Sequence, residues 1–119
     1  MTDNKKHSGQ LEPAVAYDMA GLLDYAIGAV VSRTIAKSNA GTITLFAFDA
    51  GQELSEHTTP YDAYVQVLDG RVRLTIGGKD IVAAAGDIVL MPAGVPHAVF
   101  ADERFKMVLI MIRDKGTDN

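Results

Sequence analysis

The stretch GQELSEHTTPYDAYVQVLDG, residues 51–70, begins and ends on glycine and carries a single histidine, His57. A second stretch, GDIVLMPAGVPHAVFA, residues 86–101, also has one histidine, His97, placed directly after the segment PAGVP. Proline cannot donate to a central strand ladder and glycine accepts a positive φ, so PAGVP predicts a stiff turn that sets where His97 emerges. Because a metal site needs several ligands, neither stretch makes one alone.

Composition excludes several classes of function. The 119 residues are 48% hydrophobic, which fits one compact domain with a real core. A net charge of −4 and a pI near 5.2 carry no electrostatic footprint for nucleic acid, so no nucleic-acid partner is expected. Cysteine is absent, which excludes disulfides, thiolate zinc sites and cysteine nucleophiles and fits a reducing cytosol. Histidine is therefore the metal ligand to look for.

The sequence gives no reason to expect a signal peptide or a membrane helix. The N-terminal segment MTDNKKHSGQLEP has no apolar run long enough for a signal peptide, and no other stretch approaches the roughly 20 apolar residues of a membrane helix. We expect a cytoplasmic protein with no membrane partner. Residues 1–12, including His7, are polar and predict a frayed tail. Residues 13–114 then form the single domain, and residues 115–119 a polar C-terminal tail.

The hydrophobic period changes after Gly28. Before it, residues 18–25, DMAGLLDY, have apolar residues at helical spacing behind an Asp suited to an N-cap, which predicts one or two helical turns. After it, apolar and β-branched residues come in short runs bounded by Gly, Pro, Asn and Asp, which is typical of strands. The nine runs cover residues 29–37, 42–49, 53–57, 63–69, 71–77, 80–84, 87–91, 97–101 and 105–112.

The connections between these runs are too short for helical crossovers, which predicts antiparallel pairing through hairpins and Greek-key returns. Residues 71–77, RVRLTIG, alternate apolar and polar side chains, so one face is predicted to be wet. Residues 108–112, VLIMI, are apolar on both faces, so both faces of the final strand are predicted to be covered. Gly70 between two runs predicts a tight reversal. Nine short strands in about 85 residues favour an all-β, jelly-roll barrel.

The two quoted stretches together resemble the signature motifs of the cupin superfamily. The first motif of that family places glycine, His-x-His, Glu and glycine in order, and the second places glycine, Pro-x-Gly, His and Asn. The resemblance covers about residues 40–112 and implies a small single-domain cupin barrel. The matching positions are Gly51, His57 and Gly70 in the first motif, and Gly86, Pro92, Gly94 and His97 in the second.

The resemblance also implies a role for the two histidines. In cupins they point into the barrel from neighbouring strands and bind one divalent metal, here Fe, Mn, Ni or Zn. This chain departs from the family at three ligand or neighbouring positions, which are Thr59 for the second histidine, Ala63 for the carboxylate and Ala101 for the amide. Losing two ligands costs at least about 3 to 5 kcal/mol, so a metal on His57 and His97 alone would be held weakly.

A third ligand would have to come from another position. Glu53 shares strand parity with His57 if residues 53–57 form a regular strand, and Asp62 would need a bulge to face the same way. The alternative is that both carboxylates face solvent. Inward histidines can equally be core residues that need no metal, hydrogen-bonded to nearby hydroxyls.

The interior predicted around the histidines is mostly apolar. Phe46 and Met111 are available to fill it, although methionine at such places is more often core filler than part of a binding site. The residues predicted to contact a ligand are His57, His97, Thr59, Tyr61, Tyr64, Phe48, Met91 and Met107.

Two classes of function follow from these residues. The first is a binding module that holds a small organic molecule in the barrel, with the histidines offering hydrogen bonds or a weak metal contact. The second is a metal-dependent enzyme, of the dioxygenase or isomerase type that the family includes, with a non-standard third ligand and water. By analogy with small cupins we expect a homodimer, with residues 11–37 at the contact. A barrel kept only as an assembly platform is a third alternative.

Overall fold

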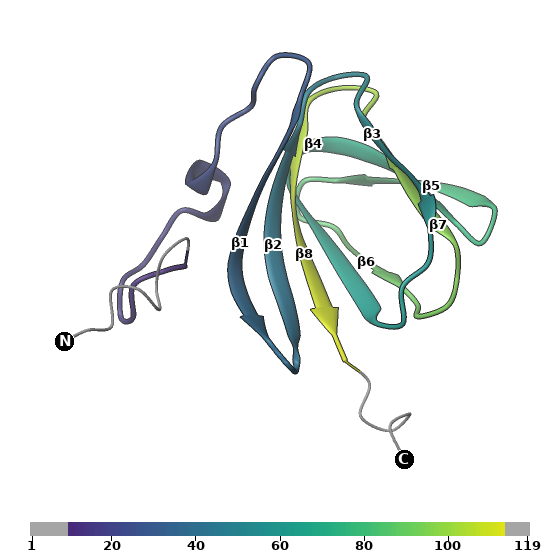
Figure 1. Ribbon diagram of the computed structural model, residues 1–119. Coiled ribbons are helices and arrows are strands. Elements are labelled where there is room, and N and C mark those ends of the chain that lie inside the picture. The colour runs from purple at the N-terminus through teal and green to yellow at the C-terminus, as the bar shows by residue number, and fades with distance from the viewer. Residues whose placement is uncertain (1–9, 114–119) are drawn as a thin grey trace.

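The computed structural model describes residues 10–113, and these residues confirm the predicted all-β class (Figure 1). A 3₁₀ turn precedes eight strands. Their bounds are η2 Met19–Leu22, β1 Val30–Ser38, β2 Gly41–Phe48, β3 Glu53–His57, β4 Asp62–Ile76, β5 Lys79–Ala84, β6 Ile88–Met91, β7 His97–Phe100 and β8 Phe105–Ile112.

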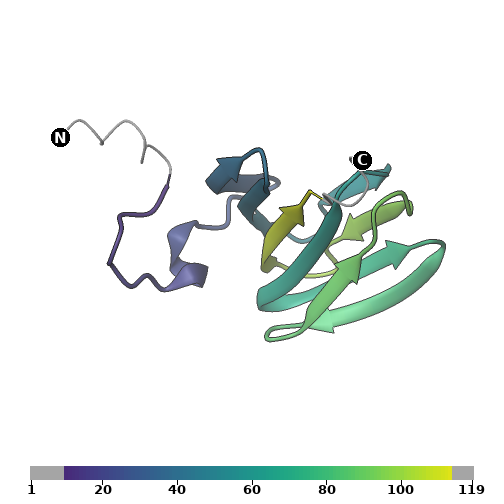
Figure 2. The same cartoon turned by 90° about the horizontal axis from the view of Figure 1, so that it is seen from below.

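The strands form one curled antiparallel sheet with the order β1-β2-β8-β4-β7-β3, and β4 also pairs with β5 and β6. Because β4 is long, its two halves belong to two facing walls. We call β1, β2, β8, β6 and the first half of β4 the first wall, and β3, β7, β5 and the second half of β4 the second wall. The view from below shows these walls curling toward each other, with the N-terminal segment to one side (Figure 2).

Gly70 corrects one prediction. Instead of separating two strands by a tight reversal, it lies inside the continuous strand β4, so eight strands form rather than nine. Its φ is 75°, and a Cβ built there would lie 2.2 Å from the carbonyl oxygen of Arg104. The register with β8 shifts between Val67 and Asp69, just before it. Glycine is therefore needed for bending and close backbone approach, which lets one strand serve both walls.

Two apolar cores lie on opposite faces of the first wall. The inner core fills the space between the walls, and the outer core lies between the first wall and the N-terminal segment. Strand β8 serves both, because Met107 faces the inner core and Val108 the outer one, each 1% exposed. Both faces of β8 are thus covered at Met107 and Val108, whereas Ile112 at the end of the strand is 48% exposed.

The N-terminal helical segment is shorter than residues 18–25. Only Met19–Leu22 form a 3₁₀ turn, and the Asp18 side chain makes no capping hydrogen bond. Tertiary contacts hold the segment instead, since Lys106 Nζ donates to the carbonyl oxygen of Ala20 at 2.6 Å and Leu23 is buried in the outer core.

Several predictions about the chain ends stay predictions. His7, most of the predicted tail 1–12 and the predicted tail 115–119 lie outside the described residues. Within residues 10–113, no helix is long and apolar enough to span a membrane. The cytoplasmic location and the bounds of the domain, 13–114, are not tested.

Candidate functional site: the histidine pair at one end of the barrel

His57 and His97 meet as directly opposed residues on neighbouring antiparallel strands, β3 and β7. Their ring centroids are 4.4 Å apart and the ring planes cross at 71°. His57 ends β3 and His97 begins β7, so the pair lies at one end of the barrel. The expectation that distant parts of the chain bring the two imidazoles together is met by this pairing.

A β-bulge determines which side chains accompany His57. The register of β3 with β7 shifts between Leu54 and His57, so the strand is not regular as the parity argument assumed. Leu54 pairs with Val99 and faces the interior, whereas Glu53 is exposed. The hypothesis that Glu53 enters as a third metal ligand is therefore wrong for this arrangement, since the bulge inverts its parity relative to His57.

Hydrogen bonds assign the tautomer of each ring. The Nδ1 atom of His57 lies 2.7 Å from the carbonyl oxygen of Ser55, and Nδ1 of His97 lies 3.2 Å from that of Val95. Because a carbonyl oxygen only accepts, each Nδ1 carries the proton and donates it. In the neutral form of either ring the lone pair is therefore on Nε2, which is the atom that faces a ligand.

Burial keeps His97 neutral. Its side chain is only 3% exposed, and burial lowers its pKa below the ordinary value of 6.5, with the neighbouring His57 acting in the same direction. The hydrogen bond to the Val95 carbonyl opposes that pKa shift without reversing it. His97 thus presents an unprotonated Nε2 atom near neutral pH.

Two loops are fastened together beside the histidines, and we call this contact the loop clasp. The backbone N–H of Gly94 donates to the carbonyl oxygen of Thr59 at 2.9 Å, and that of Ala93 donates to Oδ1 of Asp62 at 2.9 Å. The clasp holds the PAGVP turn, from which His97 emerges. Asp62 is committed to this backbone contact, so the hypothesis that it is a third metal ligand is not supported.

A cavity of about 160 Å³ adjoins the histidine pair inside the barrel. Apart from the two imidazoles and the side chain of Thr59, its lining is apolar and comes from both walls. The lining residues are Phe46, Leu54, His57, Thr59, Ala63, Met91, His97, Val99, Met107, Leu109 and Met111. Five of the eight residues predicted to contact a ligand are among them.

The other three predicted residues lie elsewhere. Tyr64 alternates with Ala63 along β4 and therefore faces outward, opposite Leu90 and Ile110. Phe48 is fully buried in the inner core, where its ring stacks on that of Phe105. Tyr61 lines a neighbouring hollow instead of this cavity.

The hydroxyl of Thr59 is engaged within its own loop, so it is not free to bind a ligand in the cavity. Its Oγ1 donates to the carbonyl oxygen of Tyr61 at 3.0 Å and lies 3.3 Å from the Tyr61 backbone N–H. The residue at the family's second histidine position therefore stabilises its own loop.

Three lining residues were missed by the sequence argument. Val99 and Leu109 stand two positions after His97 and Met107, so strand alternation could have found them. Leu54 could not be found in this way, because its inward direction depends on the bulge in β3.

Comparison with known proteins places this geometry in a family. The model of the family described as Cupin domain, Cupin_2, matches residues 44–113, which is more than half of the chain. The chain belongs to the cupin family. A solved cupin superfamily protein from Desulfitobacterium hafniense DCB-2 is 28% identical, with a TM-score of 0.83 over 88% of this chain and 96% of that one.

Other relatives are themselves without assigned function. A conserved protein of unknown function from Streptococcus pyogenes is 34% identical, with a TM-score of 0.85 over 89% of this chain and 93% of that one. An uncharacterized protein from Streptomyces coelicolor is 36% identical over 56 residues, which cover 47% of this cupin. This cupin spans only about half of that protein, 53% of its length.

The donor set of this cupin falls short of a resident metal centre. Across residues 10–113, no group of three or more His, Cys, Asp or Glu side chains is placed to hold a metal ion. Protein metal centres with catalytic roles usually have three protein ligands, and here the two imidazoles are joined by apolar side chains. The residues present fit a weak two-nitrogen contact and do not fit the full cupin ligand set.

Proposed function

We propose that this cupin binds a small organic molecule in the cavity beside His57 and His97. The observation that carries the proposal is the pair of imidazoles at an otherwise apolar cavity, with each Nδ1 engaged by a backbone carbonyl and each Nε2 left for a ligand. Apolar pockets with a few convergent polar groups are typical ligand sites, because burial supplies affinity and the polar groups select orientation.

The chemistry of the pocket specifies the ligand class. An unprotonated Nε2 accepts hydrogen bonds, so the ligand brings an O–H or N–H donor to this end. Methionine side chains around the remainder of the cavity adapt to an apolar body. The volume of about 160 Å³ is comparable to an engineered cavity of about 150 Å³ that accepts benzene, so one ring fits.

We favour binding over metal-dependent catalysis because of the donor set. The alternative is a divalent ion bound by the same two Nε2 atoms, and we expect such an ion to compete only weakly with the organic ligand. The third ligand that an enzyme of the dioxygenase or isomerase type would need is not found among residues 10–113.

The first prediction tests the pocket with 4-propylphenol, which has one ring and one hydroxyl donor. Titration calorimetry should show binding that weakens at least about tenfold in His57→Ala and His97→Ala, because a hydrogen bond to Nε2 is lost. Ala63→Leu should also weaken binding, since it fills the cavity beside Met91. The methyl ether 4-propylanisole is the matched control ligand and should bind less tightly, because it has no donor.

Two results would argue against the proposal. One is 4-propylphenol binding that is unchanged by both histidine substitutions in variants with native circular dichroism. The other is equal affinity for the phenol and its methyl ether. Added Zn²⁺ should displace the phenol only at high concentration, as expected for two ligands without a third.

A further inference from the structure

We propose that Lys37, Thr42 and Tyr61 form a second subsite, at the mouth of the barrel, that binds a carboxylate at the far end of the same ligand. The ligand would then be a small hydroxy acid with an apolar body. The inference rests on the proposed function for the body of the ligand, and it adds the anionic end.

The subsite is a hollow of about 120 Å³ next to the histidine cavity. Met111 lines both spaces, so they are separated by one flexible side chain. The hollow is lined by Lys37, Ser38, Asn39, Gly41, Thr42, Tyr61 and Met111, and no carboxylate is among these residues.

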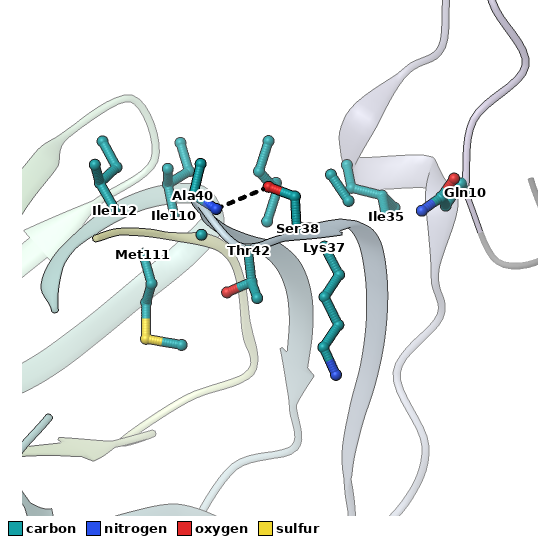
Figure 3. A pocket seen from close by; sticks show the side chains of 12 residues that line it. Gln10, Ile35, Lys37, Ser38, Ala40, Thr42, Ile110, Met111 and Ile112 are labelled. Atoms are coloured by element: carbon teal, nitrogen blue, oxygen red, sulfur yellow. Dashed lines mark hydrogen bonds between the residues drawn. The ribbon is translucent and has the colours of Figure 1, made fainter. Parts of the chain in front are cut away.

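Register explains how a lysine comes to face this hollow. The pairing of β1 with β2 shifts between Thr34 and Ala36, and after the shift Lys37 pairs with Thr42. The bulge thereby turns Lys37 toward the inner side of the first wall. In Figure 3 the side chains of Lys37, Thr42 and Met111 extend to one side of the sheet. Those of Ile110 and Ile112 extend to the other side in the same view.

One row of paired residues connects the subsite to the histidine cavity. Thr42 pairs with Met111 across β2 and β8, and Met111 pairs with Ala63 across β8 and β4. Ala63 lines the histidine cavity. Neighbouring strands are about 4.8 Å apart, so Thr42 and Ala63 are separated by about 10 Å. A single small molecule can therefore reach from one space to the other.

The Thr42 hydroxyl is a second, independent observation that supports a ligand in the hollow. Its Oγ1 is buried and has no hydrogen-bond partner in the protein, which is true of no other buried side-chain nitrogen or oxygen among the described residues. A buried hydroxyl left unpaired destabilises the protein, because it has lost its hydrogen bonds to water without replacement. A ligand atom in the hollow would recover part of that loss.

The three side chains share a preference for an anionic acceptor. Lysine carries three donors and a positive charge, and the threonine and tyrosine hydroxyls can each donate. A carboxylate is an acceptor with a negative charge, and hydrogen bonds between ionised partners are roughly twice as strong as neutral ones. A carboxylate at the mouth and a hydroxyl at the histidine pair thus satisfy both ends of the combined site.

The test compares 4-(4-hydroxyphenyl)butanoate with its neutral amide, 4-(4-hydroxyphenyl)butanamide, by titration calorimetry at fixed pH and salt. The two probes share the phenol and the apolar body and differ only at the mouth end. The wild-type protein should bind the acid about tenfold more tightly than the amide. Lys37→Gln and Thr42→Val should remove most of this preference, because each should weaken acid binding more than amide binding. Lys79→Gln, an exposed lysine on β5, is the matched control and should retain the preference.

The outcomes separate the subsite from the pocket. Equal wild-type affinity for acid and amide overturns the subsite and leaves the pocket standing, and binding of neither probe overturns both. A preference that survives in both variants, or that disappears only in His57→Ala, also overturns the subsite, because the carboxylate would then lie elsewhere. Thr42→Val should unfold at an equal or higher temperature than wild type, which separates a lost subsite from a lost fold.

Discussion

At the scale of the residue, Gly70 shows most clearly how one position controls the barrel. Its positive φ disfavours any side chain, and the carbonyl oxygen of Arg104 occupies the place of a Cβ. We predict that Gly70→Ala lowers the free energy of unfolding by at least about 3 kcal/mol, because backbone must move to accept the methyl group. Urea denaturation followed by circular dichroism measures this change.

Gly51→Ala is the matched control for that experiment. Gly51 has a φ of 87°, yet nothing lies within 4 Å of a Cβ built there. The control should therefore cost only the conformational penalty, about 1–2 kcal/mol. Equal losses in the two variants would show that close approach to Arg104 is not what requires glycine at position 70.

His97 makes stability depend on pH. Its pKa in the folded protein is lower than its ordinary value of 6.5, so below that pH the unfolded chain binds a proton that the folded protein resists. The stabilising contribution of neutral His97 is present above about pH 6.5 and is lost as the pH falls from there toward the folded pKa. We predict a lower urea midpoint for wild type at pH 5.5 than at pH 7.5.

The variant His97→Gln removes this titration while keeping a donor for the Val95 carbonyl. Its urea midpoint should change less between the same two pH values than that of wild type. Parallel changes in the two proteins would assign the pH dependence to other groups.

At the scale of the element, register shifts and the loop clasp position the site. The clasp joins the loop before β4 to the turn before β7, through Asp62 and Ala93 and through Thr59 and Gly94. A loose turn would let His97 change its angle to His57, and a misplaced ring would lose its hydrogen bond to the ligand. The clasp is therefore a positioning device rather than part of the pocket lining.

We predict that Asp62→Ala destabilises the protein by about 1–3 kcal/mol, because the Ala93 N–H loses a charged acceptor. The same variant should weaken 4-propylphenol binding without altering the preference for phenol over methyl ether. Asp80→Ala is a comparison variant on an exposed hairpin, where the lost partner is the Thr75 hydroxyl. Identical phenol affinity in Asp62→Ala and wild type would mean that the clasp does not position His97.

At the scale of the whole molecule, the outer face of the first wall remains apolar beyond the N-terminal segment. A groove of about 370 Å³ lies along β1, β2 and β8, and its lining includes Ile35 and Ile110 of the outer face as well as Lys37, Thr42 and Met111 (Figure 3). Near it, Ile88, Leu90 and Ile112 are 60%, 44% and 48% exposed. Exposed apolar side chains gathered on one face often mark an interaction site.

We predict that a second copy of the chain covers this face, giving the homodimer expected from the family. Part of residues 11–37, the contact region expected from the sequence, borders the groove. A stable interface needs about 800 Å² from each partner, and sedimentation equilibrium measures the mass directly. Leu90→Glu should shift the protein to monomer, and Val82→Glu, at the exposed β5 position, should not. A monomeric wild type at high concentration would contradict the prediction.

Much of the fold could be read from the sequence. Alternation along residues 71–77, turn residues between short runs and the two glycine-bounded motifs predicted an antiparallel barrel with His57 and His97 as the inward pair. These patterns are local in the sequence or depend on fixed spacing. Because successive side chains of a strand point to opposite faces, the pattern shows directly which residues share a face.

Only the tertiary structure decided which side chains reach the interior where the strands are irregular. The shift in β3 replaced Glu53 with Leu54, the shift in β1 turned Lys37 inward, and the bend at Gly70 fused two expected strands into one. A bulge inserts one extra residue into a strand, so the side chains after it point to the opposite face from the one that regular alternation predicts. No local pattern reveals a bulge, because the partner strand is distant in the chain. The histidine pair was therefore predictable, whereas the composition of the space around it had to wait for the packing of the two walls.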